Sequence, residues 1–275
     1  MNKEQIEEIV GERMESSIVG TGKIRTVSGK TYFVKTGNGS EAYRCEANGL
    51  RELEKTGVIR VPETIGAGDD YMVTEYIENR SPDREFFKEF GRQLAQMHRY
   101  TSDGFGFYEN NFIGQNPQPN IPSGSEAHDW GIFYWNKRLL FQYRLAESNG
   151  YATVALKHAF LHLESRIGMF FAESEEPPAL LHGDLWAGNF LCDAQNAPVL
   201  IDPAVYYGHR EADLAMTKLF GGFPPAFYEA YQQEYPLPEG WQRRENLYLL
   251  YHVMNHLNLF GHGYLRQAEH LAASY

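Results

Sequence analysis

The chain has 275 residues, a length that suits one large domain or two modest lobes with a sizeable core. Apolar residues make up 43% and charged residues 22% of the sequence, a composition that excludes extensive disorder. The formal net charge of -11 argues against a nucleic-acid-binding surface, because phosphate backbones are held mainly by clustered Lys and Arg.

Two features of the sequence predict a cytoplasmic protein with no membrane partner. Its cysteines, Cys45 and Cys192, are far apart and form no Cys-x-x-Cys motif, so we expect reduced, buried thiols. The N-terminal stretch is charged throughout, unlike a secretory signal, and no apolar run approaches the ~18 to 20 residues that span a bilayer.

The N-terminal part of the chain predicts a small β-rich lobe. Residues 1–10 have the pattern of an amphipathic helix, and the β-branched and aromatic run 31–35 is typical of a strand. Apolar side chains recur every three or four residues over 41–56, which predicts a second helix that ends at Gly57. Further strands are expected around Ile65 and over residues 71–77.

Beyond a hinge near residues 76–82 the pattern changes to that of helices. The Asn-, Gly- and Pro-rich segment 104–124 is predicted to be a long surface loop that faces the substrate. Two helices are expected over 130–168, and the last third of the chain is again mostly helical. We therefore predict an α+β fold with two lobes, a nucleotide-binding lobe at 1–77 and a larger catalytic and substrate-binding lobe at 78–275.

The most specific pattern in the chain lies between Leu180 and Asn189. Asp184 precedes Asn189 at the spacing Asp-x-x-x-x-Asn, and Asp202 follows at the end of a β-like run. Phosphoryl transfer needs a group that accepts or orients a hydroxyl proton, and hard oxygens for the Mg²⁺ that bridges nucleotide phosphates. The pattern predicts a kinase, with Asp184 as proton acceptor and Asn189 and Asp202 as metal ligands.

A lysine that contacts phosphate completes the minimal set for this chemistry. Lys35 closes a predicted strand, and Glu46 follows eleven residues later on the predicted helix, where the two can form the ion pair that directs a lysine at the phosphates. Glu41 is an alternative partner for the lysine.

Two backbone segments are predicted to contact the nucleotide. Gly20, Thr21 and Gly22 lie where a glycine-rich loop would cover the phosphates, although the full Gly-x-Gly-x-x-Gly pattern is absent and a plain hairpin turn fits as well. The second segment is the strand between the lobes, whose backbone would pair with adenine; it consists of Glu75, Tyr76 and Ile77.

The residues around the motif resemble a known family. Gly188-Asn189-Phe190 and Leu200-Ile201-Asp202 are similar to the phosphotransferases of the aminoglycoside and choline kinase superfamily. The long run 201–216, followed by 219–223, resembles the fructosamine kinase (ketosamine-3-kinase) family more specifically. The likeness extends over nearly the whole chain and is loose only in the first thirty residues. It includes 33–35, 46–50, 94–98, 105–107, 111–114 and 251–258.

This resemblance implies the two-lobed protein kinase-like fold and ATP-dependent phosphorylation of the C3 hydroxyl of ketosamines, a deglycation repair activity. It assigns Asp184 as proton acceptor, Asn189 and Asp202 as Mg²⁺ ligands, and Lys35, positioned by Glu46, as the phosphate-binding residue. The expected partners are Mg²⁺, ATP and a free or protein-bound ketosamine, and the protein is expected to be a monomer or a weak dimer.

Other residues are candidates for contacting the substrate. Trp186 follows the predicted base closely, and Trp130, His209, Arg210 and Glu211 are further polar or aromatic candidates, although each of these side chains suits packing or loop bracing as well.

Three histidines and one proline have more specific interpretations. His182 is expected to be a buried, hydrogen-bonded support, and the helical pair His252 and His256 lacks a third ligand for a metal. Pro203 replaces the Phe of the protein kinase Asp-Phe-Gly motif, so we expect no flipping activation switch.

Two alternatives stay open at this point. One is a kinase for another small hydroxyl compound, such as an aminoglycoside or an amino alcohol. The other is a nucleotide-binding pseudokinase scaffold, which the complete set of Lys35, Asp184, Asn189 and Asp202 disfavours.

Overall fold

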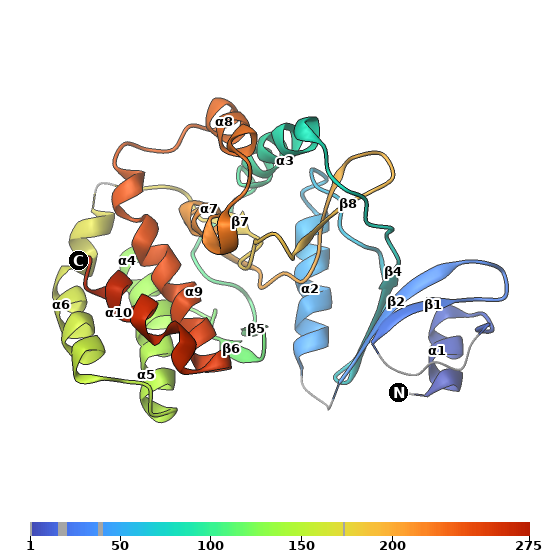
Figure 1. Cartoon of the computed structure of the whole chain (residues 1–275), viewed down its shortest axis with the longest axis horizontal. Helices are drawn as coiled ribbons and strands as arrows, with labels where there is room; N and C mark the ends of the chain where they lie inside the picture. Colours follow the sequence, from blue (N-terminus) through green and yellow to red (C-terminus); the bar gives the residue numbers. More distant parts are fainter. Residues whose placement is uncertain (1, 16–20, 38–40, 173) are drawn as a thin grey trace.

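The computed structural model describes residues 2–15, 21–37, 41–172 and 174–275. The described part confirms the predicted α+β class, with a small sheet region at one side and a larger, mainly helical region at the other (Figure 1). The chain leaves the sheet after Glu75 and enters the first helix of the larger region at Arg84.

An antiparallel sheet of four strands in the order β1-β2-β4-β3 forms the small region. Its alternating side chains separate two environments, because successive residues of a strand point to opposite faces. Val34 and Val73 are fully buried in a small core with Ile6, while Met72 belongs to the main core with Leu50. The strands are β1 (Gly22–Arg25), β2 (Thr31–Thr36), β3 (Thr64–Ala67) and β4 (Tyr71–Glu75).

Two helices belong to this region. Helix α1 (Lys3–Val10) begins with a capping box at Asn2, and its Ile6 packs into the small core. Helix α2 (Ala42–Glu54) confirms the helix predicted over 41–56 and lies between the sheet and the rest of the molecule (Figure 1). The strand predicted over 71–77 is shorter than expected, because pairing ends at Glu75.

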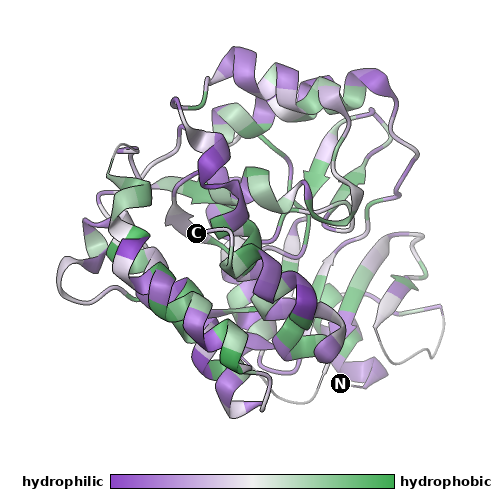
Figure 2. Ribbon diagram, turned by 60° about the vertical axis from the view of Figure 1, so that its left-hand side comes forward, coloured by the Kyte–Doolittle hydropathy of each residue, from purple (hydrophilic) through white to green (hydrophobic). Residues whose placement is uncertain are grey.

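The larger region is built mainly from helices with mixed faces. Figure 2 shows hydrophilic and hydrophobic residues on the same helices, as expected where one side of a helix packs inward. The helices are α3 (Arg84–Met97), α4 (Trp130–Tyr134), α5 (Leu140–Ser148), α6 (Val154–Phe171), α7 (Glu211–Met216), α8 (Pro225–Glu234), α9 (Glu245–Phe260) and α10 (Leu265–Ala272).

Three short antiparallel ribbons connect these helices and position the site described below. Each consists of two strands, so each relies on the surrounding helices for stability. The pairs are β5 (Asn111–Ile113) with β6 (Asn116–Gln118), β7 (Ala179–Leu181) with β10 (Tyr206–Gly208), and β8 (Phe190–Cys192) with β9 (Pro198–Leu200).

The segment 104–124 differs from the predicted surface loop. It contains the β5–β6 hairpin, and Asn111, Gln118 and Asn120 within it are buried. Asn111 donates a hydrogen bond to the carbonyl oxygen of Val205 at 2.8 Å and accepts one from Gln118 at 2.8 Å. Composition suggested exposure, but these amides are buried because they satisfy one another and the backbone.

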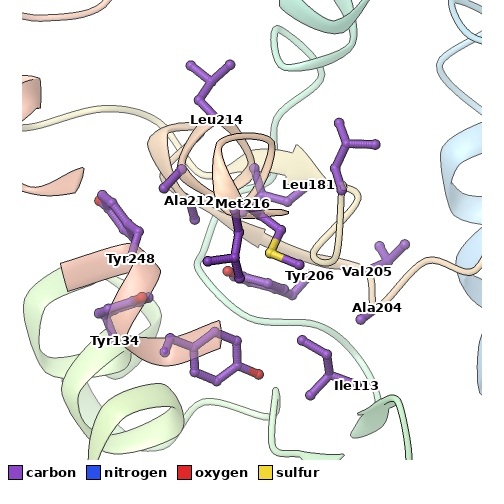
Figure 3. Packing of buried hydrophobic residues seen from close by; sticks show 14 of the residues in the cluster. Ile113, Tyr134, Leu181, Ala204, Val205, Tyr206, Ala212, Leu214, Met216 and Tyr248 are labelled. Carbon is purple, nitrogen blue, oxygen red and sulfur yellow. The ribbon is translucent and has the colours of Figure 1, made fainter. Parts of the chain in front are cut away.

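The main core joins the ribbons to the helices. Figure 3 shows Tyr206 of β10 and Leu181 of β7 near Met216 of α7, with Tyr134 and Tyr248 on neighbouring helices. Both cysteines are free and buried, as predicted. None of the helices in the described residues is long and apolar enough to cross a membrane.

Candidate active site

The loop between β7 and β8 carries the predicted proton acceptor. Gly183 has a φ of 84°, and a Cβ on it would lie 2.0 Å from the carbonyl oxygen of Ala204. Only glycine fits so close to that backbone without strain. This tight turn places Asp184 directly after β7, at the wall of a cavity.

Buried side chains hold this loop from behind. Asp213 of α7 accepts hydrogen bonds from the backbone N–H groups of His182 at 2.7 Å and Gly183 at 2.8 Å. The Nε2 atom of His182 lies 2.9 Å from the carbonyl oxygen of Ile201, and its Nδ1 accepts from the N–H of Asp184. Burial lowers the pKa of His182, so it is neutral and supports the loop, as predicted.

Asp184 and Asn189 are in direct contact. The Asn189 amide donates to the backbone oxygen of Asp184 at 2.8 Å and to its carboxylate at 3.2 Å. Burial raises the pKa of Asp184 from its ordinary value of 3.8 to about 7, with Asn189 opposing the shift. A carboxylate with a pKa near 7 is suited to accept a proton at neutral pH.

Lys35 connects the sheet, α2 and the end of β9. Its Nζ atom lies 2.6 Å from a carboxylate oxygen of Glu46 and 2.6 Å from one of Asp202. Burial alone would lower the pKa of Lys35, but the two carboxylates outweigh it and hold the pKa above its ordinary value. The alternative partner, Glu41, pairs with Arg44 instead.

Asp202 adopts an unusual backbone conformation. Its φ is 55°, in the left-handed region that non-glycine residues rarely occupy. The turn directs its side chain to Lys35 and leaves that side chain 45% exposed. Strained residues of this kind cluster at functional sites, where surrounding structure holds them in place.

Two cavities meet at these charged groups. The nucleotide-side cavity, about 450 Å³, lies under the sheet, and the acceptor-side cavity, about 350 Å³, lies beside the loop of Asp184. Lys35, Glu46 and Asp202 line both. A group transferred from a ligand in one cavity to a ligand in the other would therefore pass these side chains.

The nucleotide-side cavity contains most of the residues predicted to bind nucleotide. Glu75, Tyr76 and Ile77 line it, together with Thr21. Thr21 accepts a hydrogen bond from the N–H of Thr36 at 3.1 Å. Gly22 begins β1, whereas the predicted contact at Gly20 lies outside the described residues.

The residues present fit a magnesium ion. Asn189 and Asp202 both line the acceptor-side cavity, and Asn189 uses its amide nitrogen in hydrogen bonds, which leaves its oxygen available. Over the described ranges no group of three or more His, Cys, Asp or Glu could hold a metal. Mg²⁺ needs no such cage, because it is usually bound through one or two protein oxygens plus phosphates and water.

Four of the five predicted substrate-contacting residues lie elsewhere. Trp186 lines the acceptor-side cavity, but Trp130, His209, Arg210 and Glu211 are buried and are not part of its lining. They occupy the region near the other end of the β7–β10 ribbon, where Ala179 pairs with Gly208.

Their observed contacts are with other residues of the protein. The Trp130 ring stacks on His209 with centroids 4.9 Å apart. The Arg210 guanidinium pairs with Glu176 at 2.6 Å, and Glu211 pairs with Arg244 at 2.7 Å. These groups brace the interior because protein partners already satisfy them.

The acceptor-side cavity also has lining residues that the motif analysis did not assign to the site. Asn111, Asn255, His256 and Phe260 belong to the β5–β6 hairpin and the end of α9. The segments 111–114 and 251–258 carried the family resemblance, and that signal could have identified Asn111, Asn255 and His256, whereas Phe260 lies outside both segments. His256 Nδ1 lies 2.7 Å from the carbonyl oxygen of His252, an arrangement that serves the helix and not a metal.

The fold and the site define a protein kinase-like phosphotransferase. The choline kinase of Streptococcus pneumoniae, at 18% identity, has the same fold, with a TM-score of 0.65 over 99% of this chain and 98% of that one. The fructosamine kinase family model matches residues 2–275. The chain therefore belongs to the fructosamine kinase family, and membership of a kinase family implies the use of ATP.

Several relatives match this chain over most of their own length. A chloroplastic protein-ribulosamine 3-kinase of Arabidopsis thaliana is 41% identical over 89% of this chain and 76% of its own. A probable ketoamine kinase of Enterococcus faecium is 38% identical over 85% and 82%. A crystal structure from Thermobifida fusca, provisionally named a fructosamine-3-kinase, is 32% identical with a TM-score of 0.89, covering 99% and 97%.

Proposed function

We propose that this protein transfers the γ-phosphoryl group of Mg-ATP to the C3 hydroxyl of ketosamines. The observation that carries the proposal is the meeting of two cavities at Lys35, Glu46 and Asp202, with Asp184 in the wall of the acceptor-side cavity. The relatives named for ribulosamine and ketoamine substrates support the choice of acceptor.

The nucleotide would occupy the cavity under the sheet. The backbone of Glu75 to Ile77 faces it with the edge expected to pair with adenine, while Leu50, Met72 and Leu191 provide apolar lining for the base. Lys35 is held by its two carboxylate partners and would contact the phosphates at the far end. This assignment also fits the proposed division into lobes at 1–77 and 78–275.

Asn189 and Asp202 would hold Mg²⁺, which would supply positive charge to neutralise the phosphates of the nucleotide. Both line the acceptor-side cavity, and Asp202 lines the nucleotide-side cavity as well. The acceptor hydroxyl would lie beside Asp184, which accepts its proton as the hydroxyl oxygen bonds to the γ-phosphorus and the bond from phosphorus to the ADP oxygen breaks. Positioning and charge neutralisation supply most of the rate enhancement in such transfers.

The acceptor-side cavity combines an aromatic wall with amide side chains. Trp186 and Phe260 provide apolar surface for the acceptor. The amide oxygens of Asn111 and Asn255 already accept hydrogen bonds from Gln118 and Asn116, both at 2.8 Å, so these two buried side chains shape the wall of the cavity. The exposed ring of Phe220 packs edge-on against Trp186, with the ring centroids 5.5 Å apart. We retain from the sequence the predictions of a cytoplasmic location and a monomeric or weakly dimeric state.

The test is coupled ATP consumption with ribulosamine and fructosamine acceptors, run beside an aminoglycoside and an amino alcohol. We expect turnover with the ketosamines, and Asp184→Ala should lower kcat by about 10²- to 10⁴-fold while retaining ATP binding by calorimetry. Asp103→Asn, at an exposed carboxylate outside both cavities, is the matched control. ATP binding without turnover on any ketosamine would reject the proposal.

A further inference from the structure

One face of α2 contacts the larger region at helical spacing. Cys45, Asn48, Gly49 and Glu52 follow one another at positions i, i+3, i+4 and i+7, which share a side of a helix. Glu46, the partner of Lys35, lies on the same helix next to this face. Contacts that hold this face of α2 in place therefore also hold the carboxylate of Glu46 next to Lys35.

The middle of the face packs directly on the segment that follows Asp202. A Cβ built on Gly49 would lie 3.1 Å from Val205 and 3.4 Å from Pro203. The absence of a side chain at Gly49 thus lets α2 lie close to the chain that carries the metal-binding carboxylate. Cys45 extends the contact at the start of the helix, with its Sγ atom 3.6 Å from the carbonyl oxygen of Asn110.

Two polar contacts fix the helix on either side of this glycine. The Tyr207 hydroxyl donates to Glu52 at 2.8 Å, and both side chains are buried. Burial and the neighbouring Glu52 raise the pKa of Tyr207, so its hydroxyl keeps the proton that it donates. The amide of Asn48 donates to the two carboxylate oxygens of Glu109 at 3.0 and 3.3 Å.

We propose that Tyr207 and Glu109 are positioning residues that hold α2 in the active arrangement and so keep Glu46 against Lys35. Tyr207 belongs to β10 and Glu109 to the segment before β5, both in the larger region. They hydrogen-bond to α2 at two positions, Glu52 and Asn48. The ion pair is then formed permanently, without the helix movement that switches many kinases. This inference rests on the proposed function only for its turnover readout.

The test measures Mg-ATP affinity by calorimetry and, in parallel, ketosamine turnover. Tyr207→Phe should weaken Mg-ATP binding and lower kcat together by about 10-fold, because a buried hydrogen bond to a carboxylate is lost. The KM for ketosamine should stay within about twofold. Glu109→Gln, at a partly exposed position, should act in the same direction with a smaller loss and no risk to folding.

A matched control separates positioning from general stability. Tyr134 is also a buried tyrosine, and its hydroxyl donates to the carbonyl oxygen of Leu247 at 3.2 Å, far from α2. Tyr134→Phe should lower the melting temperature about as much as Tyr207→Phe, yet leave Mg-ATP affinity unchanged. Equal affinity in all three variants and the wild type would overturn the proposal.

A double mutant identifies the route of the effect. If Tyr207 acts through Glu46, then adding Tyr207→Phe to Glu46→Gln should cause no further loss of Mg-ATP affinity. If the double mutant instead lost Mg-ATP affinity by the product of the two single-mutant factors, the proposal would be overturned. Failure of the wild type to phosphorylate any ketosamine would reject the proposed function alone, since the calorimetric comparison needs no acceptor.

Discussion

Two clusters of acidic and basic side chains in this molecule differ in their surroundings and in the number of partners that each side chain has. The site cluster, made of Lys35, Glu46, Asp184 and Asp202, lines open cavities. The bracing cluster, made of Arg210 with Glu176 and Arg244 with Glu211, lies in the interior of the larger region. In the bracing cluster each guanidinium reaches two carboxylate oxygens, while in the site cluster a single lysine serves two acids.

The comparison shows that charge alone does not distinguish a site residue from a structural one. The number of hydrogen-bond partners that a charged side chain has within the protein is more informative. Arg210 also donates to the carbonyl oxygens of Tyr235 and Pro236, so its donors are satisfied within the protein. Asp184 instead bears the cost of burial with only the amide of Asn189 against its carboxylate. We expect substitutions in the two clusters to affect activity and stability in opposite ways.

The largest effect should come from Asp184→Asn. Turnover should fall by about 10²- to 10⁴-fold, because the proposed proton acceptor is lost. Stability at pH 8 should rise, because the pKa of Asp184 is raised from 3.8 to about 7 in the folded state. The folded protein then loses stability as pH rises between those values, and asparagine removes this penalty. Thermal unfolding at pH 8 measures the gain, and an unchanged or lower melting temperature would contradict it.

In the bracing cluster, Arg244→Met should have the opposite effect. It leaves Glu211 buried without its partner, which costs about 3 to 5 kcal/mol of unfolding free energy. The KM values for ATP and ketosamine should stay within about twofold at temperatures where the variant is folded. Denaturant unfolding measures the loss of stability, and steady-state kinetics measures the two KM values. A large rise in either KM with normal stability would place Arg244 in the site.

The pH profile of kcat/KM tests the site cluster without mutation. Because the pKa of Asp184 is about 7, activity should rise about 10-fold per pH unit below 7 and level off above it. In the proposed mechanism the ionised form of Asp184 accepts the proton, so activity should fall toward acid pH. A profile that is flat from pH 5.5 to pH 8 would show that another group limits the reaction.

The smallest predicted effect distinguishes the role of Trp186 from that of Trp130. Trp186→Ala should raise the KM for ketosamine by about 10-fold with little change in ATP affinity, because one aromatic contact to the acceptor is lost. Trp130→Phe, at a buried ring stacked on His209, should lower the melting temperature and leave that KM unchanged. A change of KM in the second variant alone would reverse the assignment.

Much of the site was predictable because its chemistry is local in sequence. The spacing from Asp184 to Asn189 lies within one loop, and the run that ends at Asp202 is a short strand, so sequence distance limits spatial distance. The pairing of Lys35 with Glu46 was also predictable, since a strand and the following helix bring such positions together. The prediction that the strand continues to Ile77 was wrong at its C-terminal end. The end of a strand depends on its pairing partners more than on the β-propensity of its residues.

The sequence by itself determined the α+β class, the order of the main elements, and the candidates for the reacting groups, because periodicity and motif spacing act over short stretches of chain. Only the tertiary structure decided which polar residues line the two cavities that meet at Lys35 and Asp202. His209 and Arg210 look as functional in the sequence as Trp186 does, yet their partners, Trp130 and Glu176, lie far away along the chain. The fates of such side chains depend on long-range contacts, which residue pattern does not specify.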